Sequence, residues 1–392
     1  MKLAIIGVGQ AGGKILDRLL EYDTTRNTNF VRHAVAINSA KQDLQGLDHV
    51  PVSNRLLIGQ SMVNGQGTGT DPETGEACAR ENIDEIQSAI DQLATTDIDA
   101  FLLIAGLGGG TGSGGAPVIA ERLQEIYLES VYGLGILPST DEGGIYNHNA
   151  ADTLQRFVEH VDNVLLFDNG AFKSSGESLT EGYAEINDEI TTRFGTLFSA
   201  GEIAAMDGNV AESVVDSSEI INTLGNQGLT SIGYASEEVT TKTDNNNGLL
   251  NRLLGSDDSE PELASAGEAT NRIQSLVRRA VLGELTLPCE VESTSRALLI
   301  VSGPPEHLNR KGIDNARSWL EETTDCQEVR AGDYPLPTED RVAVLVVLSG
   351  MTDIPRINEI QELAVDARQT AEAQEAESTN SFRELIEYEN EI

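Results

Sequence analysis

The stretch FLLIAGLGGGTGSGGAPVIAERLQ, residues 101–124, constrains the fold more than any other part of the chain. An apolar run, Phe101–Ala105, has the length and composition of a buried parallel strand. Shortly after it, Gly108–Gly114 consists only of Gly, Thr and Ser. Ala116–Gln124 then has the pattern of an amphipathic helix, with Pro117 in its first turn. The stretch therefore predicts a strand, a loop and a helix of an α/β protein.

The glycine-rich loop has a chemical use. Its backbone N–H groups point toward one place at the start of a helix, where the helix dipole is positive. Such a place suits a phosphate. Thr111 and Ser113 add hydroxyl donors. The alternative is a flexible linker, but linkers rarely lie between a buried strand and a helix, so phosphate binding is favoured. A Walker A loop is excluded because its lysine is missing.

GGGTGSG, residues 108–114, resembles the signature of the tubulin/FtsZ superfamily. Members of this superfamily bind GTP and assemble head to tail into filaments. The resemblance implies GTP or GDP as the ligand and a second copy of the chain as the partner. It also implies that the phosphate tail contacts Gly108, Gly109, Gly110, Thr111, Gly112, Ser113 and Gly114.

A second glycine-rich loop follows the first predicted strand. Lys2–Ile6 is expected as the strand, Gly7–Gly13 as the loop and Lys14–Tyr22 as the helix. Alone, this pattern equally opens a dinucleotide-binding fold, which wants an acidic residue at the end of the second strand. The strand expected at His33–Ile37 is followed instead by Asn38. In the superfamily the two loops flank one nucleotide, and the resemblance implies contacts from Gly9, Gln10, Ala11 and Gly12.

Further loops match the superfamily pattern. Asn38 stands where its second nucleotide loop begins, and residues 65–72 resemble the third loop, which senses the γ-phosphate. This implies contacts from Gly67, Thr68 and Gly69, although such a cluster is often only a turn. Beyond it, Glu81–Leu93 is expected as an amphipathic helix.

The resemblance also assigns the sugar and base. Leu134–Leu137 is expected as a strand, and residues 138–146 look like the ribose loop, in which Glu142 accepts a hydrogen bond from the sugar. The arginine that follows this glutamate in FtsZ is absent, since Tyr146 and Asn147 stand there. Asn169, after a strand expected at Val164–Phe167, matches the asparagine that contacts guanine.

A long helix is expected over residues 181–199, and it carries Tyr183 and Asn187 at positions i and i+4 on one face. The tyrosine ring can stack on a purine while the asparagine pairs with its edge. In an anonymous helix these residues would be a partly buried tyrosine and a surface asparagine. Their match to the central helix of the superfamily favours the nucleotide.

Residues 209–224 resemble the loop that reaches the nucleotide of the neighbouring subunit, NxDxxD in FtsZ and NxDxxE in α-tubulin. Asp216 and Glu219 match the two acids, while Val214 replaces the asparagine. A carboxylate there can orient or deprotonate the attacking water. The structural alternative is a helix start in which Asp216 is the N-cap, and both roles are compatible.

The C-terminal part has fewer chemical signals. Residues 242–268 are a polar insertion, at the place where tubulins make lateral contacts. Ala269–Leu282 is a basic helix that pairs with a neighbour or with its own surface. The runs GPPEHLNRKGI, EVRAGDYPLP and LSGMTDIPRI resemble CetZ, the archaeal tubulin-like family. The tail, residues 366–392, is solvated, or binds a protein partner through Phe382, Leu385 and Ile386.

The strongly negative net charge of the chain restricts the solution conditions in which the protein is stable. The chain has 64 Asp and Glu but 26 Lys and Arg, a net charge of −38. Such a surface repels itself unless salt screens it, and the Debye length falls to about 3 Å near 1 M salt. This favours the cytoplasm of a halophilic archaeon. No basic patch suggests nucleic acid, and no apolar run reaches the ~20 residues of a membrane span, so direct membrane insertion is not expected.

These observations give one prediction. The fold is α/β and tubulin/FtsZ-like, with a GTP-binding domain at 1–180, a central helix at 181–205, a smaller α/β domain at 206–355 and a terminal helix and acidic tail at 356–392. The resemblance implies that the protein hydrolyses GTP with Mg²⁺, forms filaments and controls cell shape. The alternatives are a GTP-binding regulator that does not polymerise and a nicotinamide-dependent oxidoreductase.

Overall fold

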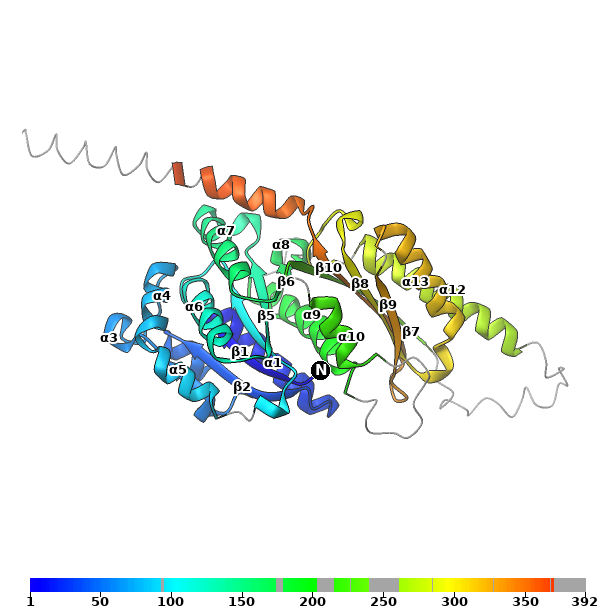
Figure 1. Cartoon of the computed structure of the whole chain (residues 1–392), viewed down its shortest axis with the longest axis horizontal. Helices are drawn as coiled ribbons and strands as arrows, with labels where there is room; N and C mark the ends of the chain where they lie inside the picture. Colours follow the sequence, from blue (N-terminus) through cyan, green and yellow to red (C-terminus); the bar gives the residue numbers. More distant parts are fainter. Residues whose placement is uncertain are drawn as a thin grey trace, which may run out of the picture.

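A computed structural model of the chain describes residues 1–92, 95–173, 179–202, 215–225, 227–239, 261–283, 285–326, 328–366 and 368–369. One sheet lies between two layers of helices (Figure 1). Its strands are β1 (Leu3–Val8), β2 (Val31–Asn38), β3 (Arg55–Leu57), β4 (Ala100–Gly106), β5 (Ser130–Leu137), β6 (Asn163–Asp168), β7 (Leu229–Glu238), β8 (Arg296–Gly303), β9 (Val329–Pro335) and β10 (Arg341–Met351).

The helices are α1 (Gly9–Arg26), α2 (Lys41–Gln45), α3 (Gln60–Val63), α4 (Pro72–Glu81), α5 (Ile83–Ile90), α6 (Thr111–Ile126), α7 (Gly144–Glu159), α8 (Asn169–Phe172), α9 (Leu179–Ser199), α10 (Ser217–Leu224), α12 (Pro261–Leu282) and α13 (Arg310–Thr324). A last helix, over residues 355–366, follows β10. The residues 242–260 of the expected insertion, Val214, and the tail residues Phe382, Leu385 and Ile386 lie outside the described part of the chain.

The strand order is β3-β2-β1-β4-β5-β6-β7-β10-β8-β9. The pairs from β3 to β7 are parallel, so their carboxyl ends lie at one edge of the sheet. β10 is antiparallel to both β7 and β8, and β8 is parallel to β9. β6 and β7 join the two halves through the pairs Val164–Leu229 and Leu165–Thr230. The fold is thus the expected tubulin/FtsZ-like α/β architecture.

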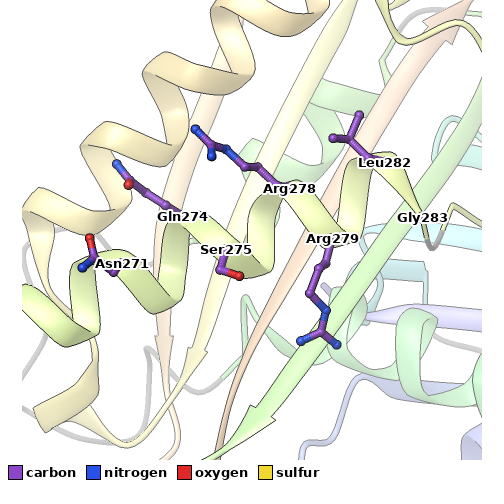
Figure 2. Close-up of a pocket in the computed structure, with 7 residues that line it drawn as sticks. All are labelled: Asn271, Gln274, Ser275, Arg278, Arg279, Leu282 and Gly283. Carbon is purple, nitrogen blue, oxygen red and sulfur yellow. The ribbon is translucent and has the colours of Figure 1, made fainter.

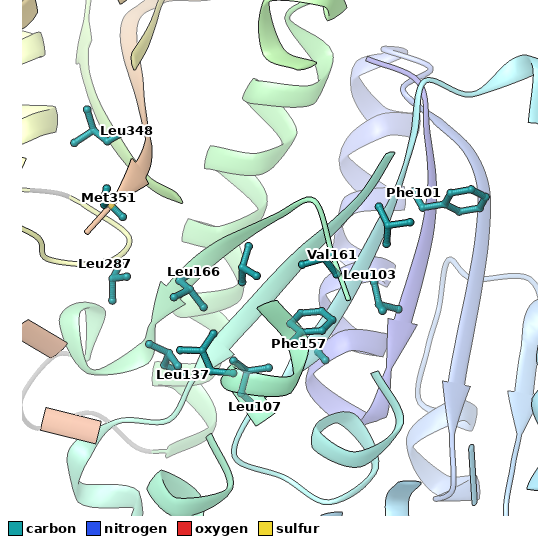
Figure 3. Close-up of a cluster of buried hydrophobic side chains, with 14 of the residues drawn as sticks. Phe101, Leu103, Leu107, Leu137, Phe157, Val161, Leu166, Leu287, Leu348 and Met351 are labelled. Atoms are coloured by element: carbon teal, nitrogen blue, oxygen red, sulfur yellow. The ribbon is translucent and has the colours of Figure 1, made fainter. Parts of the chain in front are cut away.

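Both faces of the sheet are covered, which explains why its strands are almost continuously apolar. One face packs against α4, α5, α6, α7, α12, α13 and the last helix, in a cluster that includes Phe101, Leu103, Leu107, Leu137 and Phe157 (Figure 3). The other face packs against α1, α2, α9 and α10. At about 25 cal/mol per Å² of apolar area, this double burial is the main stabilising contribution.

The helix after the signature loop begins earlier than expected. α6 begins at Thr111, so the second half of the loop is already helical and Pro117 lies in the second turn, not the first. Its missing N–H leaves the Ser113 carbonyl without an intrahelical partner. Close packing explains the early start: a Cβ at Gly114 would lie 2.0 Å from the Pro72 carbonyl oxygen of α4. Small residues let the two helices touch by their backbones.

The amphipathic helix expected at Glu81–Leu93 is wrong in its bounds. The structure has two shorter helices here, α4 and α5, separated at Asn82. The Asn82 side chain accepts the Gly59 N–H at 2.8 Å and donates to Glu85 at 3.1 Å. Asparagine offers the backbone such local alternatives to a continuous helix, and here they interrupt it.

Candidate functional site

A cavity of about 730 Å³ opens at the carboxyl edge of the parallel strands. It gathers residues from segments far apart in the sequence. Those expected from the sequence are Gly9, Gln10, Ala11, Asn38, Gly67, Thr68, Gly69, Gly108, Gly109, Gly110, Thr111, Gly112, Glu142, Asn169, Tyr183 and Asn187. Gly12, Ser113 and Gly114 lie outside its lining, as do Asp216 and Glu219.

Two long helices begin at this cavity without side-chain caps. The N-cap residue of α1 is Val8 and that of α6 is Gly110, and neither makes a side-chain capping hydrogen bond. No acidic residue lies in the first turn of either helix. Uncapped N–H groups at the positive ends of two helices form a site for a multiply charged anion. This geometry fits a polyphosphate.

The two glycine-rich loops approach each other closely. Gly9 has φ +73°, and a Cβ there would lie 2.9 Å from the Gly112 backbone nitrogen. A Cβ at Gly110 would lie 2.0 Å from the Thr68 hydroxyl oxygen. At Gly109, by contrast, an added Cβ would meet no atom within 4 Å. Gly9 and Gly110 are thus required by packing, whereas Gly109 faces open space in the cavity.

Hydroxyl groups meet beside these loops. Thr111 and Ser39 are hydrogen-bonded through their hydroxyls at 2.6 Å, and Thr68 lies 3.5 Å from Thr111. Ser113 differs from the expectation. Its hydroxyl donates to the Leu107 carbonyl at 2.7 Å, and the residue is fully buried. We therefore correct the role expected for Ser113: it ties the loop to the start of its helix and offers no donor to the cavity.

Asn38 and Glu142 hold their own turns as well as lining the cavity. The Asn38 amide donates to Asp43 at 3.1 Å, and its oxygen accepts the Ala40 N–H at 3.0 Å. The Glu142 carboxylate accepts the Ser139 N–H at 2.9 Å, as part of a capping box. Burial first, and then the hydrogen-bonded Glu142 carboxylate, raise the pKa of Tyr183. Glu142 and Tyr183 thus form one polar wall.

Asn169 begins α8 and is capped by the residue before it. The Asp168 carboxylate accepts the Gly170 N–H at 3.0 Å, which fixes this short turn. Asn169 is 9% exposed, and its side-chain oxygen has no hydrogen-bond partner among the described residues. A buried acceptor without a partner is costly unless a ligand satisfies it. Since Asn169 lines the cavity, it fits a base that donates a hydrogen bond.

Sequence reasoning missed two cations in the lining. The chain has six lysines, and Lys14 and Lys173 both line the cavity. Lys14 follows Gln10 by one turn of α1, whereas Lys173 donates to Asp141 at 2.5 Å. The scarcity of lysine in so acidic a chain was the available signal. A lysine one helical turn after a glycine-rich loop suits a phosphate.

The two candidate acids lie beyond the C-terminal end of α9 and near the amino end of β1, because Gly201 packs against both Asp216 and the Met1 nitrogen. Asp216 is the N-cap of α10 and accepts the Glu219 N–H at 3.1 Å, so the capping expectation is confirmed. Gly201, just beyond α9, packs against Asp216 and Ser217. Asn187, which lines the cavity, also belongs to α9. At 1.5 Å per residue it lies about 18 Å along the helix from Ser199, the last residue of α9. Glu219 therefore does not reach the cavity of its own chain.

The environment of Glu219 changes its acidity. Burial, and then the nearby Asp216 carboxylate, raise the pKa of Glu219, while Arg330 opposes them. The hydrogen bond from Ser218 is the main reason that the pKa of Asp216 is lowered. The pair thus separates into a capping anion and a half-buried acid that takes up a proton more readily.

The basic helix lies apart from this cavity. Arg272 pairs with Glu237 at 3.0 Å, and Arg278 lies over the Trp319 ring at 5.7 Å. A shallow cavity of about 570 Å³ is lined by Asn271, Gln274, Ser275, Arg278, Arg279, Leu282 and Gly283, from α12 and its end (Figure 2). Arg272 and Arg278 thus contact their own chain, as one of the two alternatives for this helix had it.

A metal site made by protein groups alone is not seen in the described part of the chain, where no three His, Cys, Asp or Glu residues converge. Mg²⁺ is usually held by phosphates, waters and one or two protein groups, so the cavity fits it only together with a polyphosphate. Among the described residues, no helix is both long and apolar enough to cross a bilayer.

Comparisons with known proteins agree with this geometry. Residues 2–176 match the model of the tubulin/FtsZ family GTPase domain, and residues 176–366 match that of the tubulin-like CetZ C-terminal domain. The chain is 58% identical to the tubulin-like protein CetZ1 of Haloferax volcanii, over 95% of this chain and 94% of that protein. With the tubulin-like protein CetZ3 of the same organism it shares 51% identity, over 98% and 97%.

Solved structures show the same fold. The GDP-bound monomer of Haloferax volcanii CetZ1 matches with a TM-score of 0.81 and 53% identity, over 94% of this chain and 100% of that one. The GTPγS-bound protofilament of CetZ2 from that organism matches with a TM-score of 0.82 and 40% identity, over 95% and 100%. The oxidoreductase alternative is wrong, because both glycine-rich loops line one cavity in a GTPase-type domain. The chain belongs to the CetZ family of tubulin-like proteins, within the tubulin/FtsZ superfamily.

Proposed function

We propose that this chain is a GTPase that assembles head to tail into filaments, and that each active site is completed by the next subunit. One observation carries the proposal: the cavity lies at the carboxyl ends of the parallel strands, whereas Asp216 and Glu219 lie beyond the far end of α9, near the amino end of β1. Stacking subunits end to end brings Glu219 of one to the cavity of another. The nucleotides named with the Haloferax structures, GDP and GTPγS, support GTP as the ligand.

The cavity supplies a distinct group for each part of GTP. The uncapped starts of α1 and α6, with Lys14, hold the phosphates, and Mg²⁺ supplies charge neutralisation when bound. Glu142 accepts a hydrogen bond from the ribose. Asn169 and Asn187 pair with the guanine, and the Tyr183 ring stacks on it.

Hydrolysis uses the acid from the neighbour. The Glu219 carboxylate accepts a proton from a water molecule as the water oxygen attacks the γ-phosphorus. The bond from the γ-phosphorus to the bridging oxygen breaks, and GDP and phosphate leave. Asp216 fixes the start of α10 and so the position of Glu219. Hydrolysis is then coupled to assembly, because a subunit without a neighbour lacks the acid.

The cellular role follows from the class of protein. We propose a cytoskeletal filament in the cytoplasm of a halophilic archaeon, with cell shape as the process it serves. The net charge of −38 and the Haloferax relatives support this setting. We keep the division at 1–180, 181–205, 206–355 and 356–392 as a proposal, together with a protein partner for the tail.

Complementation between two variants tests the shared site. Glu219→Gln leaves the cavity intact but removes the base, and general bases contribute about 10²- to 10⁴-fold. Gly109→Asp places a carboxylate in the open space of the cavity without a clash, so it repels phosphates but keeps Glu219. Each variant alone should be inactive in molar KCl, and a mixture should release phosphate. Glu121→Gln, a change at a partly exposed acid of α6 that lies 3.7 Å from Arg80 and outside the cavity lining, is the control.

Light scattering and co-sedimentation, recorded with phosphate release, separate the outcomes. Recovery of phosphate release in the mixture supports a site shared between subunits. Absence of recovery, although both variants co-sediment, contradicts it. GTP binding without assembly at any protein or salt concentration would instead identify the non-polymerising regulator.

A further inference from the structure

The last helix reaches the nucleotide cavity through one buried arginine. Arg356, in its first turn, is 7% exposed and donates to the Pro138 carbonyl at 2.7 Å. Its Nε lies 3.2 Å from Oδ2 of Asp168, which is also buried. The Nε–H is not directed along that line, so the contact is an ion pair. One side chain thus joins the last helix to the ends of two strands.

Both contacts lie directly behind cavity residues. Pro138 follows β5, lines the cavity and precedes the capping box that contains Glu142. Asp168 ends β6 and caps α8, whose first residue is Asn169. The turn that carries the ribose-side carboxylate and the turn that carries the base-side asparagine are therefore held by the same guanidinium. Among the described residues, Arg356 is the only cation that forms an ion pair with Asp168.

The helix itself is packed onto the core. Ile360 of the helix, and Ile354 just before it, belong to the buried apolar cluster on the α7 face of the sheet, and Ala364 of the helix is buried as well. Figure 1 shows this helix leaving β10 and running beside α7. Glu359 pairs with Arg356 at 2.8 Å from the outer side, where it is half exposed. Docking of the helix thus places Arg356 under the cavity.

We propose that Arg356 is a positioning residue for the nucleotide and that docking of the last helix and nucleotide binding reinforce each other. The inference rests on the proposed GTP site. Without Arg356, the Asp168 carboxylate is buried and unpaired, and the turn it caps loses its anchor. Because coupling between two binding events is reciprocal, bound nucleotide holds the helix in place by the same factor.

A double-mutant cycle separates this role from loss of folding. Arg356→Met keeps most of the side-chain volume but removes the charge and the donors. Asp168→Asn keeps a capping oxygen for Gly170 and removes the buried charge. We expect about tenfold weaker binding of both GTP and GDP in Arg356→Met, and part of it restored in the double variant. Glu359→Gln, at the exposed partner, is the control and should change affinity less than about twofold.

The preference for guanine over adenine is the readout that a general loss of protein stability would not change. In Arg356→Met we expect the preference for GTP over ATP to fall several-fold, because Asn169 is misplaced. If Arg356→Met binds GTP and GDP as the unchanged protein does, with the same preference over ATP, the proposal is overturned.

Hydrogen exchange without nucleotide decides the matter even if the chain binds no GTP. We expect faster exchange of residues 169–172 in Arg356→Met, with unchanged exchange in α6. In the unchanged protein, GTP should slow exchange of residues 355–366. Equal protection of residues 169–172 in both proteins overturns the positioning role, whereas absence of GTP binding by the unchanged protein contradicts only the proposed function.

Discussion

Asn149, a buried residue of α7, donates its side-chain amide to the Thr70 carbonyl oxygen at 3.0 Å, across 79 residues of the chain. The same amide donates to the Gly108 carbonyl at 3.1 Å. Thr70 and Gly108 line the nucleotide cavity from two different loops, while Asn149 lies behind them. One side chain therefore fixes the distance between the loop at residues 65–72 and the signature loop at residues 108–114.

Asn149→Ala should affect GTP more than GDP. The change removes the donor of the buried Gly108 carbonyl and of the partly buried Thr70 carbonyl, at a cost of about 1–3 kcal/mol, and lets the two loops separate where we propose that the γ-phosphate binds. We expect about tenfold weaker GTP binding, which corresponds to about 1.4 kcal/mol, and a smaller loss for GDP. Titration with fluorescent nucleotides measures both constants.

The control for this prediction is Asn163→Ala. Asn163 is a buried asparagine that donates to Ser349 at 3.1 Å, away from the cavity. Its loss should lower stability without changing the ratio of the GTP and GDP dissociation constants. An equal loss for both nucleotides in Asn149→Ala would contradict the role given to Asn149.

Gly75→Ala should destabilise the protein although alanine favours helices. A Cβ at Gly75 would lie 2.3 Å from the Gly110 carbonyl oxygen, because α4 and α6 touch by their backbones. Moving the helices apart costs about 1–3 kcal/mol and shifts the signature loop. Denaturant unfolding in molar KCl measures the stability change, and a nucleotide titration the change in affinity.

A second glycine in a helix provides the matched control. Gly267 is exposed on α12, and an added Cβ would meet no atom within 4 Å. Gly267→Ala should therefore stabilise the protein by about 0.5–1 kcal/mol. The two identical substitutions should have opposite signs, and equal effects would show that α4 and α6 are not in close contact.

As the pH is lowered, GTP hydrolysis should be lost at a higher pH than it would be with a glutamate of ordinary pKa. The acid must be ionised to accept a proton, so the rate falls as pH falls through its pKa. Burial and the neighbouring Asp216 raise the pKa of Glu219, which moves this fall upward. Asp216→Asn removes the repulsion and should move it back to lower pH. Arg330→Met removes the cation that lowers the pKa of Glu219, so the fall in rate should move to a higher pH.

The measurement is phosphate release against pH in molar KCl, with filament mass followed by sedimentation at each pH. Asn at position 216 still caps α10, so a change of the rate profile without a change in assembly isolates the electrostatic effect. A profile that stays at the same pH in both variants would show that Glu219 is not the titrating group.

Salt should stabilise this chain strongly. Its net charge of −38 makes self-repulsion large at low ionic strength, and screening shortens its range from about 10 Å at 0.1 M salt to about 3 Å at 1 M. We expect the melting temperature, followed by circular dichroism, to rise with KCl between 0.1 and 2 M. NaCl at equal ionic strength should act alike. A melting temperature that does not depend on salt would contradict this account.

Several parts of the fold were predictable because their signals are local. Strand β4, the glycine-rich loop after it and the central helix α9 follow from apolar runs and from backbone demands of a few adjacent residues. The bounds of α6 and the break at Asn82 were not predictable, because they depend on contacts with α4 and Gly59. Tertiary contacts override local preference at helix ends.

In the candidate site, too, some features were predictable from the sequence and others depended on the tertiary structure. The sequence by itself determined which residue types are present: two glycine-rich loops, a tyrosine and an asparagine one turn apart, and two acids at the start of a helix. The tertiary structure decided where their side chains point. It turned the Ser113 hydroxyl inward, brought Lys14 and Lys173 to the cavity and placed Arg356 behind it. It also placed Glu219 beyond the far end of α9 from the cavity. These positions depend on pairing and packing between residues far apart in the chain, which no local pattern encodes.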